Sequence, residues 1–175
     1  MASLILTVIG PDRPGLVRAL AQAVADRGGS WLESRMARLA GQFAGIVLVD
    51  APMDVVDDLR RLEQEGLHIL VQPAGAAEPV ASARGERLVL EVTGNDRPGI
   101  VRDVTRILAN SGVNIEELTT HVESGSFTGG TLFRAAAVLR APNAEAVETA
   151  RAGLEQLGNE LMVDVRPAAD RPEAV

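Results

Sequence analysis

The chain has 175 residues, a formal net charge of −7 and a hydrophobic fraction of 46%. It contains no cysteine, no tyrosine and no lysine, because all 17 of its basic residues are arginine. These absences exclude disulfides, thiol nucleophiles, cysteine-ligated zinc sites, and lysine-based catalysis or phosphate binding.

The same composition excludes further classes of function. An acidic chain with one tryptophan and three phenylalanines offers neither a basic face nor stacking platforms, so we expect no direct nucleic-acid binding. No apolar run approaches the roughly 20 residues that a membrane helix needs. The first apolar run begins at Leu4, which leaves no room for a secretory signal. We therefore expect a cytoplasmic protein with no membrane association.

The first half of the chain predicts the order strand, helix, strand, strand, helix, strand. Branched and other aliphatic residues favour strands, and apolar residues at a spacing of three and four favour helices. Gly28 is placed to end the first helix, and Gly41 is placed in a hairpin turn. In chain order the expected elements are a strand at 3–10, a helix from Leu16 to Gly28, strands at 30–40 and 43–50, a helix at 53–66 and a strand at 67–73.

The second half repeats the first. The sequence D-R-P-G stands at 12–15 and again at 96–99, 84 residues later, and two further stretches match in order at slightly larger offsets. Such ordered self-similarity indicates an internal duplication. The expected elements of the second copy are a strand at 87–94, a helix at 98–111, strands at 113–123 and 131–140, a helix at 143–158 and a strand at 160–166.

This order predicts an α+β fold made of two ferredoxin-like βαββαβ sandwiches in tandem. Right-handed crossovers and short connections favour an antiparallel four-stranded sheet with both helices on one face in each copy. We expect domains at 1–73 and 87–167, separated by a small, Pro- and Gly-containing linker at 74–86 and followed by a flexible tail at 168–175.

The D-R-P-G turn lies where the first strand of each copy leads into its first helix. A structural interpretation accounts for it: Asp12 and Asp96 cap the helix, and Pro14 and Pro98 fall within the first helical turn, where a missing N–H costs nothing. A functional interpretation uses the same chemistry. Backbone N–H groups at a helix start attract a carboxylate, and a nearby acid pairs with an ammonium group. A small zwitterion, such as an amino acid, matches that polarity.

The βαββαβ pattern, the D-R-P-G turn and S-G-V-N-I at 111–115 resemble the ACT domain family, small-molecule-sensing modules that mostly bind amino acids. Two such domains with no enzyme attached resemble the glycine cleavage system transcriptional repressor group. G-T-L-F-R-A-A-A-V-L-R-A-P at 130–142, behind an elongated hairpin, strengthens that resemblance, which covers about residues 3–167.

The resemblance implies a ligand between paired ACT domains, against the first strand-to-helix loop and the start of the second strand. In the second copy these positions are Gly94, Asn95, Asp96, Pro98, Gly99, Ile100 and Asn114. In the first copy they are Gly10, Pro11, Asp12, Pro14, Gly15 and Ser30. Ser30 replaces the asparagine, so we favour the second copy. The alternative for Asn114 is that it only shapes the entry into its strand.

Other polar features have simpler interpretations. The Gly- and Ser-rich loop at 124–131 lacks the lysine of a phosphate-binding loop and is expected to be a hairpin tip. Neither His68 nor His121 has a second ligand at metal-binding spacing or a neighbouring serine–acid arrangement. We expect no metal, no cofactor and no catalytic residues.

Together these features predict a non-catalytic, amino-acid-sensing regulatory protein. Its resemblance implies glycine or serine as ligand, a transcription regulator as protein partner, and control of glycine and one-carbon metabolism. One alternative is a detached regulatory subunit of an amino-acid metabolic enzyme. Another is an enzyme with a purely carboxylate-based or borrowed site. Exposed edge strands of such sheets favour pairing, so we also expect a homodimer.

Overall fold

The computed structural model describes residues 1–64, 66–75, 85–124 and 130–168. The chain divides into two compact units, Met1–Glu78 and Pro79–Val175. Most of the predicted linker and tail, and the tip of the second hairpin at 125–129, lie outside the described residues.

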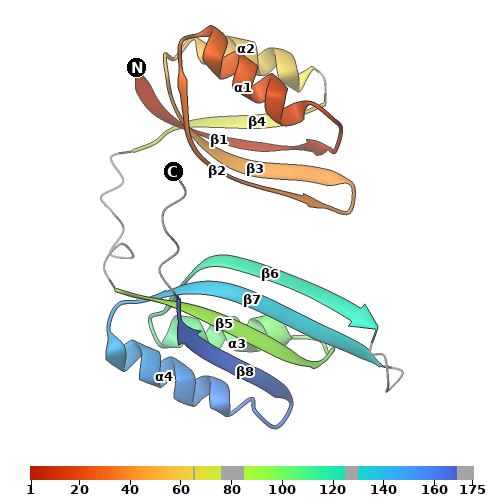
Figure 1. The fold of residues 1–175 in the computed structure, drawn as a ribbon, viewed down its shortest axis with the longest axis vertical. Helices are drawn as coiled ribbons and strands as arrows, with labels where there is room; N and C mark the ends of the chain where they lie inside the picture. Colours follow the sequence, from red (N-terminus) through yellow and green to blue (C-terminus); the bar gives the residue numbers. More distant parts are fainter. Residues whose placement is uncertain (65, 76–84, 125–129, 169–175) are drawn as a thin grey trace. The chain divides into compact units, whose positions relative to one another are not determined.

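Each unit is an antiparallel four-stranded sheet with two helices on one face, as predicted (Figure 1). In the first domain the sheet order is β2-β3-β1-β4. Its elements are β1 (Ala2–Pro11), α1 (Leu16–Asp26), β2 (Ser30–Leu39), β3 (Gln42–Ala51), α2 (Val55–Glu63) and β4 (His68–Pro73).

The second domain repeats this architecture with the sheet order β6-β7-β5-β8. Its elements are β5 (Glu86–Asn95), α3 (Ile100–Asn110), β6 (Asn114–Ser124), β7 (Thr131–Ala141), α4 (Ala144–Glu155) and β8 (Leu161–Pro167). Both α4 and the β6–β7 hairpin are longer than their counterparts α2 and β2–β3, as the offsets of the repeat predict.

Glycines set the turns that link these elements. Gly28 has a φ of 67°, and its N–H donates to Ala25 O at 2.8 Å while Gly29 N–H donates to Val24 O at 3.0 Å. This is a Schellman ending of α1. The β2–β3 hairpin turns through Ala40 and Gly41, both with positive φ (48° and 79°), which matches the twist of the strands.

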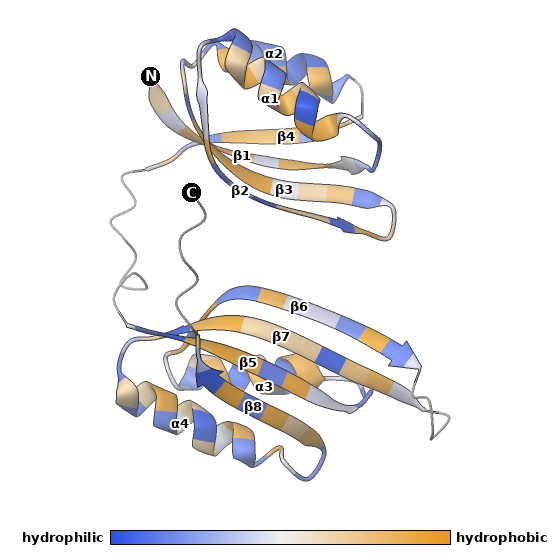
Figure 2. Cartoon of the chain, in the orientation of Figure 1, coloured by the Kyte–Doolittle hydropathy of each residue, from blue (hydrophilic) through white to orange (hydrophobic). Residues whose placement is uncertain are grey.

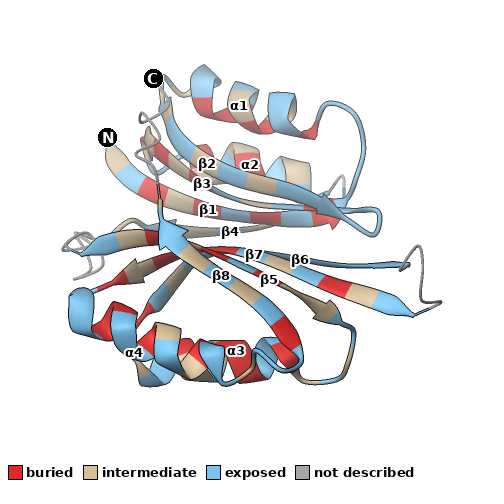
Figure 3. Ribbon diagram, turned by 60° about the horizontal axis from the view of Figure 1, so that its bottom comes forward, coloured by how far each residue is buried: buried red, intermediate tan, exposed pale blue. Residues whose placement is uncertain are grey.

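The apolar core of each domain lies between its helices and the helix-facing side of its sheet (Figure 3). Alternate residues of the central strands point into it, because successive side chains of a strand face opposite sides. In β1 these are Leu4, Leu6 and Val8, and in β5 they are Leu88, Leu90 and Val92. The other side of each sheet carries no helix of its own domain.

Both domains carry a bulge at the same place in the strand that follows the first helix. The register shifts between Trp31 and Glu33 in β2, and between Ile115 and Glu117 in β6. Trp31 is partly buried and packs against the core of the first domain.

Candidate functional site

The start of α3 leaves backbone donors without helical partners. Its first intrahelical hydrogen bond runs from Asp103 N–H to Gly99 O (2.9 Å), and no side chain caps the helix. The N–H groups of Ile100, Val101 and Arg102 therefore have no acceptor within the helix. By contrast, Asn143 caps α4 by accepting from Ala146 N–H at 2.9 Å.

The predicted capping role of Asp12 and Asp96 is wrong. Gly15 and Gly99 occupy the cap positions, with φ of 95° and 90°, and Pro14 and Pro98 precede the helices rather than lying in their first turns. This left-handed conformation suits glycine and turns the chain sharply before the helix begins. Each aspartate thus lies three residues before the cap, too early to reach the helical N–H groups.

The two aspartates instead close the ends of their sheets, and they differ in their side-chain partners. Asp96 N–H donates to Thr131 O, and Asp12 N–H donates to Gly41 O, both at 2.9 Å. The Asp12 carboxylate pairs with the Arg38 guanidinium of β2 at 2.6 Å. Val122 stands at the matching position of β6, and no described side chain pairs with the Asp96 carboxylate.

A cluster of arginines surrounds one buried carboxylate at the start of α3. Asp103 accepts from Arg97 Nη1 and Arg102 Nε, each at 3.1 Å, and Arg106 Nη2 lies 3.7 Å away. Arg97 Nε also donates to Glu160 at 2.7 Å, which ties the D-R-P-G turn to the segment before β8. Three guanidinium groups therefore surround two carboxylates at this end of α3, and the Asp96 carboxylate of the turn is a third acid at the same corner.

These contacts shift the ionisation of the cluster. The hydrogen bond from Arg97, followed by that from Arg102, lowers the pKa of Asp103 below its usual value. The reciprocal hydrogen bond to Asp103 raises the pKa of Arg97. Asp103 therefore stays ionised through the neutral range and holds the arginines beside the open helix start.

Two of the candidate glycines serve the packing of the sheet. A Cβ atom on Gly94 would lie 2.6 Å from Leu161 Cδ2 and 2.7 Å from Glu160 O. A Cβ atom on Gly10 would lie 2.7 Å from Gly66 O. Both positions need glycine because the backbone at or just before the start of the last strand lies in close contact with them.

The resemblance grouped Asn114 and Ser30 with the D-R-P-G corners as one binding site, but within each domain both residues lie far from that corner. Asn114 pairs with Arg140 of β7, which pairs with Arg87 near the beginning of β5, whereas Asp96 follows the end of β5. Ser30 likewise pairs with Asp50, which pairs with Ser3 near the beginning of β1.

The remaining candidates of the second copy do lie together at the corner: Asn95, Asp96, Pro98, Gly99 and Ile100. Pro11, Pro14 and Gly15 form the equivalent corner with Asp12.

Comparison with protein families returns the ACT domain, matched at residues 2–70 and again at 86–167. The chain belongs to the ACT domain family. This confirms the resemblance that the motifs indicated, and each match coincides with one βαββαβ unit.

Solved structures agree with this assignment. An unknown protein from Galdieria sulphuraria is 30% identical, with a TM-score of 0.80, over 96% of this chain and 99% of that chain. A "putative glycine cleavage system transcriptional repressor" is 17% identical, with a TM-score of 0.69, over 97% and 98% of the two chains. Comparison with curated proteins returns no match.

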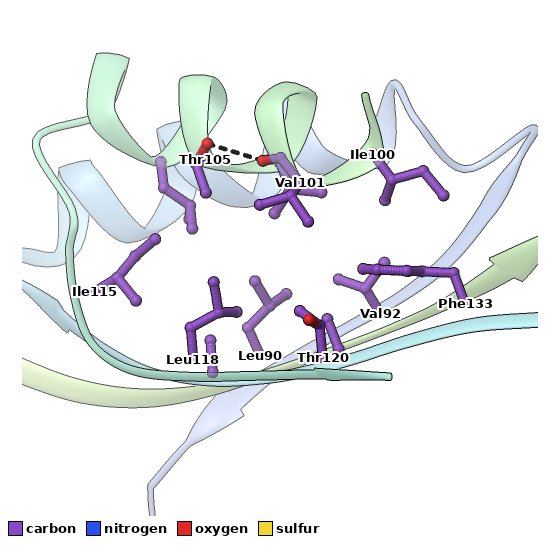
Figure 4. A pocket seen from close by; sticks show the side chains of 13 residues that line it. Leu90, Val92, Ile100, Val101, Thr105, Ile115, Leu118, Thr120 and Phe133 are labelled. Atoms are coloured by element: carbon purple, nitrogen blue, oxygen red, sulfur yellow. Dashed lines mark hydrogen bonds between the residues drawn. The ribbon is translucent and has the colours of Figure 1, made fainter. Parts of the chain in front are cut away.

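The second ACT domain also holds a small apolar cavity between α3 and the edge strand β6. Its volume is about 20 Å³, room for about one water molecule. Figure 4 shows Val101 and Thr105 on the helix side and Leu118 and Thr120 on the strand side. The Thr105 hydroxyl donates to Val101 O at 2.8 Å, so it does not point a free donor into the space.

In the first ACT domain a larger side chain stands at the corresponding place. Met36 occupies the position of Thr120 and packs against the core. It lies over Gly45, where a Cβ atom would be 2.6 Å from Met36 Cγ. The two domains therefore differ in packing under the edge strand as well as in the partners of their D-R-P-G aspartates.

The role of Asp103 was not predicted. The sequence does carry a signal for it, because Ala19 stands at the matching position of the first copy. An acid that is present in only one copy, next to the D-R-P-G turn that both copies share, marks a local difference between the copies. Among the described residues, no group of three or more metal-ligating side chains comes together, and no helix is long and apolar enough to cross a bilayer.

Proposed function

We propose that the second ACT domain binds a small amino acid at the start of α3, and that the chain is a non-catalytic regulator controlled by that ligand. The observation that carries this proposal is the pairing of an uncapped helix start with a nearby carboxylate that no described side chain engages, Asp96. The two features have the opposite polarities of a zwitterion.

The carboxylate of the ligand is bound at the helix start. The N–H groups of Ile100 and Val101 donate to it, and the helix dipole and the Arg102 guanidinium add positive potential. The ammonium group is bound by Asp96. The first domain lacks a free acid at this position, because Asp12 already pairs with Arg38. One binding site per chain follows.

A second copy of the chain supplies Asn114. β6 is an edge strand and runs in the same direction as β5, since both are antiparallel to β7. When two copies join antiparallel along β6, the Asn114 of each copy lies at the Asp96 end of the other sheet. Exposed apolar residues along this edge, Val101, Leu118 and Val122, favour such a homodimer.

The ligand acts by stabilising this seam. A ligand held between two copies binds the paired arrangement more tightly than the separate one, so its binding changes association with further proteins. We propose glycine or serine as ligand and a transcription regulator of glycine and one-carbon metabolism as partner. The likeness to the repressor-type protein supports a partner that regulates transcription. The acidic charge of this chain supports a partner that contacts the DNA itself, instead of this chain.

A calorimetric panel of the common amino acids tests the proposal. We expect heat of binding from glycine or serine with the natural chain, a large loss of affinity in Asp96→Ala, and unchanged affinity in Asp12→Ala. No binding of any amino acid would contradict the proposal. Affinity purification with and without the ligand then identifies the partner, and recovery of a metabolic enzyme instead of a transcription regulator would favour the detached-subunit alternative.

A further inference from the structure

The helix-free faces of the two sheets differ in polarity. At three matching positions the first domain carries Ile9, Ile46 and Leu70 where the second carries Thr93, Ala136 and Asp164, whereas at a fourth position the first carries His68 and the second Met162. The three residues of the first domain are large and about half exposed, at 47%, 53% and 56%. Figure 2 shows the hydropathy along these strands.

The face of the second domain is suited to water. Arg166 on β8 pairs with Glu91 of β5 and with Asp164 at 3.1 Å, and Arg134 of β7 pairs with Glu123 of β6. The Arg166–Glu91 and Arg134–Glu123 pairs join neighbouring strands, and the Arg166–Asp164 pair lies within β8. The two faces have the same strand order and register, so the second serves as an internal reference for a solvated face in this fold.

The face of the first domain has shallow apolar hollows instead. One lies among Ile5, Ile46 and Leu48, and the other among Ile9, Ala37 and Ala44. The Arg35 side chain borders both and pairs with Glu33 at 3.0 Å. Apolar side chains of a second surface fit such hollows, with the Glu33–Arg35 pair at the rim.

The size of the face meets the requirement of a stable interface. A sheet of four strands, most of them ten residues long, measures roughly 20 Å by 30 Å from the spacing and rise of strands. This gives about 600 Å² per partner, near the lower end of specific interfaces.

We propose that the helix-free face of the first domain packs against the same face of a second copy of the chain. Self-complementary charge selects this occupant. Glu33 and Arg35 lie two residues apart on β2, so a two-fold axis that crosses the strands near Ser34 places each Arg35 against the other copy's Glu33. This contact is separate from the β6 edge and does not depend on the ligand.

Matched arginine substitutions on the two sheets test the assignment by sedimentation without ligand. Ile46→Arg buries an unpaired charge in the proposed contact, so we expect self-association at this face to weaken roughly 100-fold. Ala136→Arg introduces the same residue at the matching exposed position of the second domain and leaves association unchanged. The proposal would be overturned if the two variants self-associated equally strongly. It would also be overturned if the natural chain were a monomer while the Ile46 side chain was protected from solvent.

Charge reversal distinguishes a contact between copies from one within a chain. Glu33→Arg alone and Arg35→Glu alone each place like charges on both copies, so each variant associates weakly. A mixture of the two variants places opposite charges across the axis and restores association. Failure of the mixture to associate better than either variant would overturn the two-fold arrangement.

Discussion

Asn114 and Asp96 lie at opposite ends of the second sheet. Asn114 is level with Arg87, through Arg140, while Asp96 follows Asn95 eight residues further along β5. At the rise of a strand this separation is about 27 Å. A small amino acid cannot span it, so one domain alone does not unite the two residues that the sequence singled out.

The first prediction is that the two residues act in trans. Asp96→Ala and Asn114→Ala each remove the site from a homodimer, but a mixed dimer keeps one intact site. An equimolar mixture of the two variants therefore recovers about a quarter of the natural binding stoichiometry if the copies pair at random. Titration calorimetry with the ligand measures this directly.

The control for this mixing experiment is the double variant Asp96→Ala/Asn114→Ala. Mixed with Asp96→Ala, it forms no intact site and recovers no binding. If the two single variants recover no more than this control does, the site is not shared between copies.

The second prediction concerns the edge at β6. Leu118→Lys places a charge in the apolar seam beside the α3–β6 cavity, so dimers that form along this edge dissociate at least about tenfold more readily. Ser34→Lys, at the matching position of the first domain, leaves the ligand-dependent association intact. Sedimentation with and without ligand measures the self-association of both variants. An equal loss of ligand-dependent association in both would mean that the dimer does not form along β6.

The third prediction follows from the lowered pKa of Asp103. A carboxyl whose pKa is lower in the folded than in the unfolded state adds stability above its unfolded value and loses it as the pH falls. The difference in unfolding free energy between the natural chain and Asp103→Asn is therefore constant near neutral pH and shrinks below about pH 4. Urea titrations across this range measure it, with the exposed Asp57→Asn as control. A difference that persists unchanged in acid would contradict the role of Arg97.

The fourth prediction tests the close approach at the sheet corner. Gly94→Ala forces a methyl group against Leu161 and the Glu160 carbonyl, and we expect it to destabilise the second domain by about 1–3 kcal/mol. Asn95→Ala, at the next, exposed position, changes stability little. Denaturant unfolding measures the stability of both variants. Equal stability would mean that the residues around Gly94 move apart to accommodate the methyl group without cost.

The architecture was predictable because local residue patterns indicate each helix and strand, and because the same order of elements occurs in both copies. Branched and other aliphatic residues predicted the strand at 3–10, observed as Ala2–Pro11, and apolar residues at helical spacing predicted the helix at 98–111, observed as Ile100–Asn110. The helix begins two residues later than predicted because Gly99 adopts a left-handed conformation, which a Pro-Gly pair alone does not reveal.

The candidate site was only partly predictable, because its decisive contacts join residues far apart in the chain. The pairing of Asp12 with Arg38 crosses 26 positions, and that of Arg97 with Glu160 crosses 63. Motif matching gave both D-R-P-G corners the same role. Only the folded structure shows that one aspartate is engaged and that Asn114 stands at the far end of its sheet.

Backbone amide resonances of isotopically labelled chain, titrated with glycine and then with serine, test the central claim most directly. The account predicts saturable shifts for Ile100, Val101 and Arg102 at the start of α3, with little change for Leu16, Val17 and Arg18 at the start of α1. Shifts confined to α1, or an α3 start that responds to no amino acid, would contradict it.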